Sequence, residues 1–231
     1  MPLNQYQQEV GPSLVDASPG KIPDITLLDG RYCSVEHLTV VDHYEDILDF
    51  YFTNQILSDW TYMYADPFES EEAVRQCLED YEQSSNPYFF AIRDKASGKV
   101  LGTFSLMAIT PKNRSVEMGR VILAPALQKT RAATEAQYLV MRYVFEGLNY
   151  RRYEWKCDSL NRPSANAAMR LGFTYEGRFR NHAIYKGRSR DTDWFSIIDS
   201  EWPVLKKRFE NWLSPENFDE QGQQKHSLRD C

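Results

Sequence analysis

Apolar residues recur along the chain with two different spacings, which predict alternating strands and helices. Alternation with a period of two residues predicts strands over 31–38, 88–93, 100–107, 115–123 and 152–157, with a closing hairpin over 173–184 and 193–198. Spacings of three and four residues predict helices over 41–53, 66–81, 131–146 and 202–212, with a short helix opening at 161–164 and stopping at Gly172. The strand, helix and strand over 115–157 favour one parallel strand pair.

The length and composition suit a single α/β domain with tails. The chain has 231 residues, of which 42% are hydrophobic, enough to bury one sizeable core. Residues 1–29 are rich in Pro, Gly, Gln and Asp and lack a clear period, so we expect an arm over the surface or partly disordered. We expect the folded domain over 30–213 and a polar, frayed tail over 214–231.

The charge balance excludes several classes of partner. The net charge of −6 gives no global basic field, so nucleic acid is not an expected partner. No apolar run approaches the ~18 residues of a membrane span, so we predict a soluble, cytoplasmic protein that does not bind membranes. The four cysteines and four histidines are scattered, which predicts neither a disulfide framework nor a metal site. Cys157, in an apolar strand, is interpreted as a small core residue.

The stretch 123–136 joins an apolar strand to a long amphipathic helix. The start of a helix carries unpaired backbone N–H groups and partial positive charge, so an anion can bind there. Lys129 and Arg131 flank this turn. The stretch therefore predicts a binding site for a phosphate or pyrophosphate, although Arg131 could also be an ordinary surface arginine.

Four segments resemble the GNAT N-acetyltransferase family across about residues 30–213, and its RimJ/RimL-like branch in particular. Gln128-Lys129-Thr130-Arg131-Ala132-Ala133 resembles the family's Gln/Arg-x-x-Gly-x-Gly/Ala loop, and Thr134-Glu135-Ala136 continues as that branch does. Asn161-Arg162-Pro163-Ser164 resembles its Asn-x-x-Ser helix start. Leu171-Gly172-Phe173 with Tyr175-Glu176-Gly177 resembles its Leu-Gly-Phe-x-x-Glu-Gly segment, and Asp199-Ser200-Glu201-Trp202 resembles the branch's closing Glu-Trp.

The resemblance implies a mixed, mostly antiparallel sheet with a splayed parallel strand pair, flanking helices, and acetyl-CoA as co-substrate without a metal. The pyrophosphate would meet the amides of the loop, while the pantetheine arm would pair with the backbone at the end of strand 115–123. Asn161 and Ser164 would line the far side. The implied coenzyme-binding residues are Val121, Leu123, Gln128, Lys129, Thr130, Arg131, Ala132, Ala133, Asn161 and Ser164.

Two positions depart from the family pattern. Arg131 stands where the loop has its central glycine; it lacks the conformational freedom of glycine but adds a guanidinium suited to phosphate. Many family members carry a tyrosine acid seven residues after the asparagine, and here that position is Ala168. Another group would then protonate the coenzyme thiolate, or the thiolate would leave as the anion.

Transfer to an amine needs a base and donors for the developing oxyanion. Glu117 is the preferred base by similarity, since that strand supplies the glutamate in related proteins; a solvated strand glutamate is the alternative. Glu154 and Asp158 are weaker candidates for the base. The backbone N–H of Ile122 is the expected oxyanion donor, because a bulge near Gly119 would free it.

Two further groups could serve as proton donors, and one loop could border the acceptor. Ser164 is assigned to the catalytic set, and Tyr185 is a second candidate donor. The aromatic residues Trp60, Tyr62 and Tyr64 either pack into the core or close the acceptor site.

The leading hypothesis is an N-acetyltransferase that moves the acetyl group of acetyl-CoA to a primary amine by direct attack in a ternary complex. The acceptor is a small molecule or a protein N-terminus. A coenzyme A-binding module without catalysis is the alternative, motivated by the missing glycine and tyrosine.

Overall fold

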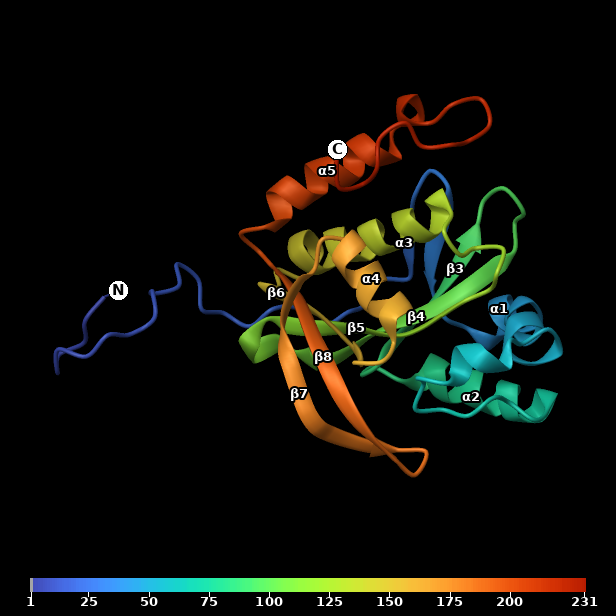
Figure 1. Cartoon of the computed structure of the whole chain (residues 1–231), viewed down its shortest axis with the longest axis horizontal. Coiled ribbons are helices and arrows are strands. Elements are labelled where there is room, and N and C mark those ends of the chain that lie inside the picture. Colours follow the sequence, from blue (N-terminus) through green and yellow to red (C-terminus); the bar gives the residue numbers. More distant parts are fainter. Residues whose placement is uncertain (1) are drawn as a thin grey trace.

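The chain forms one mixed sheet of eight strands in the order β1-β2-β3-β4-β5-β6-β8-β7 (Figure 1). We describe residues 2–231 of a computed structural model; Met1, the first residue of the predicted arm, lies outside the described residues. All neighbouring strands pair antiparallel except β5 and β6, which are parallel. The strands are β1 (Leu27–Asp29), β2 (Cys33–His37), β3 (Tyr88–Asp94), β4 (Val100–Thr110), β5 (Ser115–Leu123), β6 (Arg152–Asp158), β7 (Thr174–Tyr185) and β8 (Arg188–Ile198).

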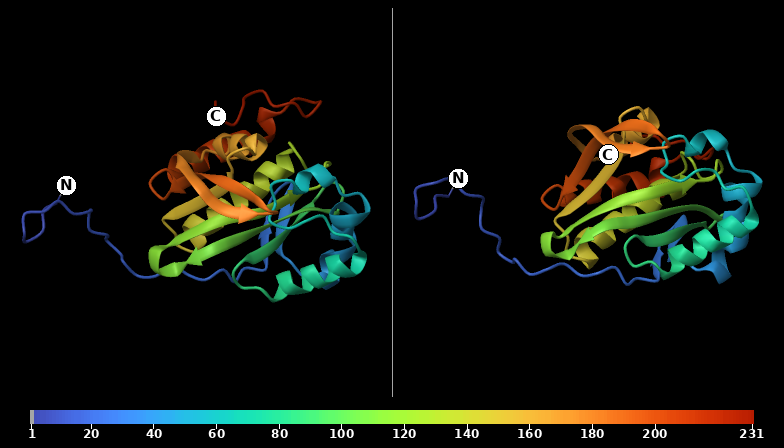
Figure 2. Two further views of the ribbon diagram at one scale, coloured as in Figure 1. Left: turned by 60° about the horizontal axis from the view of Figure 1, so that its bottom comes forward. Right: turned by 90° about the horizontal axis from the view of Figure 1, so that it is seen from below.

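Helices cover both faces of the sheet and divide the core into two clusters (Figures 1 and 2). On one face α3 packs against the sheet and α5 packs on α3, with α4 beside β6 and β7. On the other face α1 and α2 cover β3 and β4. The helices are α1 (Val40–Leu48), α2 (Glu71–Gln83), α3 (Arg131–Arg142), α4 (Arg162–Arg170) and α5 (Trp202–Leu213), and π-helical turns at Asp49–Thr53 and Tyr143–Gly147 extend α1 and α3.

The parallel pair β5 and β6 separates partway along its length. Register partners run from Ser115 with Arg152 to Met118 with Trp155, after which both strands continue without pairing. The predicted parallel pair and its splay are therefore confirmed. Because α3 crosses from the end of β5 to the start of β6, this opening lies beside the predicted coenzyme loop.

The two ends of the chain differ in part from the sequence-based expectation. The N-terminal part of the arm projects away from the domain (Figures 1 and 2), but the Asp16 carbonyl accepts from Arg114 at 2.9 Å, and the arm also contains β1, which pairs with β2 at the edge of the sheet. The last segment is not frayed: Leu228 is buried in the core, and the indole Nε1 of Trp212 donates to Gln224 Oε1 at 2.9 Å. Strand pairing therefore holds the end of the arm to the domain, and the burial of Leu228 with the Trp212 hydrogen bond holds the C-terminal segment.

Candidate active site

The predicted coenzyme loop is a turn over residues 125–130 that ends in a helix cap. Thr130 is the N-cap of α3, and its hydroxyl oxygen accepts from the N–H of Ala133 at 3.1 Å. Lys129 has a left-handed backbone with φ of 61°. Arg131 is the first residue of the helix, so the position of the missing glycine needs no special conformation. The replacement of that glycine therefore creates no backbone strain.

Several backbone N–H groups at the start of α3 remain open. Within residues 2–231 the N–H groups of Lys129, Arg131 and Ala132 have no hydrogen-bond partner, whereas that of Ala133 bonds to the Thr130 cap. The Gln128 side chain instead donates to the carbonyl of Leu123 at 3.0 Å and closes the turn. The loop thus offers a set of unpaired donors to an anion, at the place the sequence predicted.

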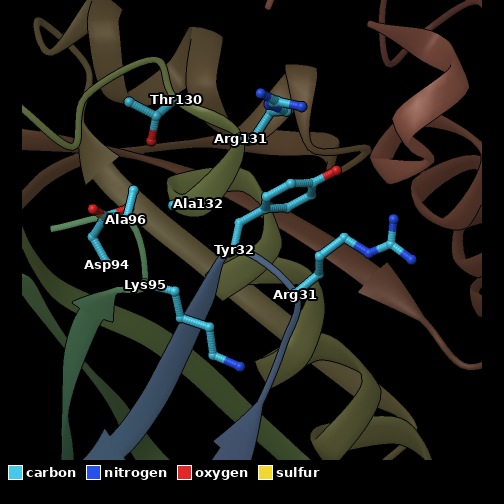
Figure 3. Close-up of a pocket in the computed structure, with 8 residues that line it drawn as sticks. All are labelled: Arg31, Tyr32, Asp94, Lys95, Ala96, Thr130, Arg131 and Ala132. Atoms are coloured by element: carbon cyan, nitrogen blue, oxygen red, sulfur yellow. The ribbon is translucent and has the colours of Figure 1, made fainter. Parts of the chain in front are cut away.

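Arg131 contacts two aromatic rings and lies beside an open pocket of about 410 Å³, whose lining residues, Tyr32 among them, are drawn in Figure 3. Its guanidinium carbon lies 4.9 Å from the ring centre of Tyr32 and 4.3 Å from that of Phe218. In the part of the chain that the structure describes, neither Arg131 nor Arg31 forms an ion pair, so both keep charge available for an anion. The pocket is lined by Arg31, Tyr32, Asp94, Lys95, Ala96, Thr130, Arg131 and Ala132.

The end of β5 contains the predicted bulge. Thr103 of β4 faces Ile122 and Ser105 faces Gly119, so two residues, Arg120 and Val121, stand opposite a single residue of β4. Arg120 has a left-handed backbone with φ of 52°. A Cβ at Gly119 would come within 2.2 Å of the Met107 sulfur, so a larger residue there would force the Met107 side chain to move.

The bulge does not free the N–H of Ile122. The Ala124 N–H donates to the Leu101 carbonyl at 2.8 Å, and Ile122 faces Thr103 two positions away. Hydrogen-bonded pairs recur at every second position of an antiparallel ladder, so the Ile122 N–H points toward β4. By the same alternation the N–H of Leu123 points away from β4, toward the opening. The group predicted as oxyanion donor is therefore directed away from the opening.

Asn161 and Ser164 lie at the start of α4, across the opening. Asn161 is the N-cap, and its side chain accepts from the Ser164 N–H at 3.2 Å. The Ser164 hydroxyl accepts from the indole of Trp155 at 3.0 Å. Trp155 faces the α3 side of β6, so Ser164 lies on the opposite side of the sheet from Glu117. Ala168, the position of the family tyrosine, is fully buried in the core.

Glu117 lies at the last part of the paired segment and is 8% exposed. Its Oε2 accepts from Lys156 Nζ at 2.7 Å, while its Oε1 has no hydrogen-bond partner within residues 2–231. Burial raises the pKa of Glu117, and Lys156 opposes that rise. On β6, burial also acts to raise the pKa of Glu154, but hydrogen bonds from Arg152 and Lys156 outweigh it and lower this pKa. The pKa values of Glu117 and Glu154 are therefore shifted in opposite directions.

Asp158 and Tyr185 form a second polar contact on the same side as Glu117. The Tyr185 hydroxyl donates to Asp158 Oδ2 at 2.8 Å. Burial, with Asp158 adding to it, raises the pKa of Tyr185 to about 12, which makes Tyr185 a poor acid near neutral pH. Asp158 is 5% exposed and also accepts from the Leu160 N–H, so it acts as an anchor for the turn after β6.

The aromatic loop over 57–66 meets the tip of the β7–β8 hairpin on this side (Figure 2). Lys186 Nζ donates to the Trp60 carbonyl at 2.7 Å, and the rings of Tyr64 and Tyr185 lie 5.5 Å apart. Trp60 itself is buried in the cluster beneath α1 and α2. Trp60 therefore packs in the core, whereas Tyr64 contacts the hairpin, and closure of the acceptor site by this loop stays a prediction.

Lys156 is the residue of this site that the sequence reasoning missed. Its ammonium lies 2.7 Å from Glu117, 2.9 Å from Glu154 and 3.9 Å above the centre of the Trp194 ring. The signal was present in strand 152–158, where charged residues occupy every second position and so share one face of a central strand. Four charges on that face need partners, which the neighbouring strands supply.

The described residues contain neither a metal-binding cluster nor a membrane-spanning helix. No group of three or more His, Cys, Asp or Glu side chains in residues 2–231 is placed to hold a metal ion. In the same range no helix is both long and apolar enough to span a bilayer. Burial raises the pKa of the Cys157 thiol, as suits a core residue.

Comparison with known proteins identifies the family. The family model described as an acetyltransferase (GNAT) domain matches residues 38–174, more than half of the chain. A crystal structure of a GCN5-related N-acetyltransferase from Brucella melitensis is 43% identical, covers 94% of this chain and 98% of its own, and superposes with a TM-score of 0.91. The chain belongs to the GNAT family and is an acetyltransferase.

Two curated relatives align over shorter stretches. The uncharacterized N-acetyltransferase p20 of Bacillus licheniformis is 30% identical over 144 residues, which are 61% of this chain and 80% of the relative. The spermidine N(1)-acetyltransferase of Escherichia coli strain K12 is 23% identical over 141 residues, 61% of this chain and 74% of the relative.

Proposed function

We propose that the protein transfers the acetyl group of acetyl-CoA to a primary amine, with Glu117 as the base. The observation that carries this proposal is the placement of Glu117 at the point where β5 and β6 part, with one carboxylate oxygen held by Lys156 and the other open. A base needs such an open oxygen, and a buried carboxylate is a stronger base than a solvated one.

The coenzyme fits the opposite side of the opening. The unpaired N–H groups of Lys129, Arg131 and Ala132 would bind the pyrophosphate, and the Arg31 and Arg131 guanidinium groups that line the adjacent pocket suit a further phosphate. Val121 and Leu123 would offer backbone groups to the pantetheine amides. Asn161 and Ser164 would border the arm from α4. This fit supports acetyl-CoA as the co-substrate.

The reaction proceeds by direct attack. Glu117 Oε1 accepts a proton from the acceptor ammonium, and the neutral amine forms a C–N bond to the acetyl carbonyl carbon. We assign the N–H of the bulge residue Val121, in place of Ile122, to the developing oxyanion, because a bulge leaves backbone groups outside the ladder. The attacking nitrogen then gives up its second proton to water, the C–S bond breaks, and coenzyme A leaves as the thiolate, since Ala168 supplies no acid.

Two acceptor classes are tested side by side. The motifs of the RimJ/RimL-like branch suggest a peptide N-terminus, while the Escherichia coli relative is named for spermidine. We therefore use a peptide with a free N-terminus and spermidine as probes. The branch assignment and the cytoplasmic location remain predictions.

The test combines coenzyme binding with turnover. Isothermal titration should show that acetyl-CoA binds, and thiol release should rise when one of the two amines is added. Glu117→Gln should lower kcat by about 10²–10⁴-fold while the KM for acetyl-CoA changes less than about threefold. Glu45→Gln, an exposed helix residue, serves as the control. Binding without turnover on either amine would favour the non-catalytic module, and an unchanged kcat would remove Glu117 as the base.

A further inference from the structure

A row of alternating charges leads across the sheet to Glu117. Arg152 makes paired hydrogen bonds to Glu176 on β7 and donates to Glu154 Oε1 at 2.6 Å. Lys156 then joins Glu154 to Glu117. The row contains three carboxylates and two cations, and Glu117 is its last member. Glu117 therefore has a single cationic hydrogen-bond partner, Lys156, whereas Glu154 has two.

Lys156 is fixed in position by its surroundings. Its side chain is only 15% exposed, and its ammonium contacts two carboxylates. The ring of Trp194, its register partner on β8, lies beneath the ammonium at 3.9 Å. A lysine side chain has many rotamers in solution, but contacts with residues of three strands hold the Lys156 side chain in one conformation. Lys156 is thus a pre-positioned cation.

The contact with Lys156 makes the two carboxylate oxygens of Glu117 different from each other. Lys156 binds Oε2, and Oε1 stays without a partner among the described residues. Glu154 is the register partner of Glu117 across the parallel pair. Without Lys156, Glu154 would keep Arg152 as its partner, whereas Glu117 would face the Glu154 carboxylate in a buried place with no paired cation of its own.

We propose that Lys156 is a positioning residue that orients the Glu117 carboxylate and keeps it ionised as the base. This inference rests on the proposed function, because it gives Lys156 a role only through Glu117. It explains why a buried cation is kept beside a residue that must accept a proton: the cation binds one oxygen and leaves the other for the amine.

The charges that face Glu117 come from two strands. On β6 they are Lys156 and Glu154, and on β8 Arg190 contributes a more distant positive charge. Its partner on β4 is Met107, which has no charge. Burial raises the pKa of Glu117, Lys156 and Arg190 lower it, and Glu154 raises it. Removal of Lys156 should therefore raise this pKa, and removal of Glu154 should lower it.

The pH dependence of kcat tests these two opposite shifts of the Glu117 pKa. Loss of an ion-pair partner at this distance shifts a carboxyl pKa by about one unit or more. In Lys156→Met the acidic limb of the curve of kcat against pH should therefore move up by about one pH unit or more. In Lys156→Arg it should stay within about half a unit of the wild-type position. Glu154→Gln should move the limb down. The assay uses whichever probe, spermidine or the peptide, is the better acceptor. Limbs that stay in place, or that move in the same direction in both charge-removing variants, would overturn the role of Lys156.

Controls separate this inference from the proposed function. Lys206→Met removes a half-buried lysine that pairs with Glu146 on the far helix layer, and it should leave the acidic limb of the profile in place. Thermal unfolding of each variant checks that it is folded. If Glu117→Gln abolishes turnover but Lys156→Met leaves the limb unmoved, the inference fails and the proposed function stands. An unchanged rate in Glu117→Gln defeats both.

A direct titration does not depend on turnover. In protein labelled with ¹³C at the glutamate carboxyl carbons, the signal that is lost in Glu117→Gln identifies Glu117. Its titration midpoint should rise by about one pH unit or more in Lys156→Met and should return toward that of the wild type in Lys156→Arg. An equal midpoint in wild type and Lys156→Met would refute the assignment, whether or not an acceptor is turned over.

Discussion

The two sides of the opening between β5 and β6 present different kinds of polar group. On the α3 side, the unpaired groups are backbone N–H groups held by a turn and a helix cap. On the Glu117 side, the polar groups are long charged side chains that contact one another across β5, β6 and β8. A backbone site tolerates substitution of its side chains, whereas a side-chain network changes when one member is lost.

This difference explains how Arg131 can replace the loop glycine. The loop needs open N–H groups and a helix start, and both survive because the left-handed residue of the turn is Lys129. No comparable freedom exists around Lys156, where three partners fix one ammonium. We therefore expect substitutions in the loop to act mainly through stability, and substitutions in the charged row to act on catalysis.

The largest loss of stability is expected for Glu135, because the α3 side also depends on this one buried side chain. A large loss there would show that the α3 side does not tolerate every side-chain substitution. The carboxylate of Glu135 accepts the N–H groups of Arg31, Tyr32 and Cys33 at 2.6–2.9 Å. Glu135→Ala would leave buried donors unpaired and should lower the free energy of unfolding by about 3 kcal/mol or more. Urea unfolding measures this, with the exposed Glu45→Ala as control; a loss below about 1 kcal/mol would contradict it.

A smaller effect is expected at the bulge. In Gly119→Ala the new methyl group would meet the Met107 sulfur, and the overpacking should cost about 1–3 kcal/mol. Met107→Ala removes the obstacle, so the double variant should lose less than the sum of the two single variants. The double-mutant cycle from denaturant unfolding checks this, and simple additivity would show that Met107 is not the obstacle.

The smallest effect is expected at the Thr130 cap, and it tests whether the α3 side uses backbone groups alone. Thr130→Ala removes the α3 cap and should cost about 1 kcal/mol of stability, while the KM for acetyl-CoA changes less than about threefold. Ser70→Ala, which removes the matching cap of α2 from the Ala73 N–H, should cost the same and leave the KM unchanged. A rise of tenfold or more in KM for Thr130→Ala alone would show that the hydroxyl takes part in coenzyme binding.

Much of the fold could be predicted because its elements are strongly periodic. The bounds of β5 and the antiparallel hairpin of β3 and β4 follow from alternation, and the parallel pair follows from the strand, helix and strand between 115 and 157. The short edge strand β1 was missed because three residues are too few to show a period. The packing of Leu228 was missed because a single apolar residue in a polar tail carries no pattern.

The site was predictable where a local motif defines it and not where partners come from distant strands. Thr130 and Asn161 are caps that a short sequence signature identifies. The direction of the Ile122 N–H depends on the register with β4, which sequence alone does not provide. Lys156 depends on Glu117 and Trp194, which lie 39 and 38 positions away, so only the folded sheet shows the contact.

The short parallel junction also has a consequence for the order of assembly. Strands β1–β5 come from residues 27–123 and β6–β8 from residues 152–198, so each half of the sheet is built from one continuous stretch of chain. Each half can form through contacts among its own strands, while their junction must wait for α3 to bring β6 beside β5. We therefore expect the opening between β5 and β6 to be completed late in folding, and a ligand that spans it to stabilise the joined state of the two halves.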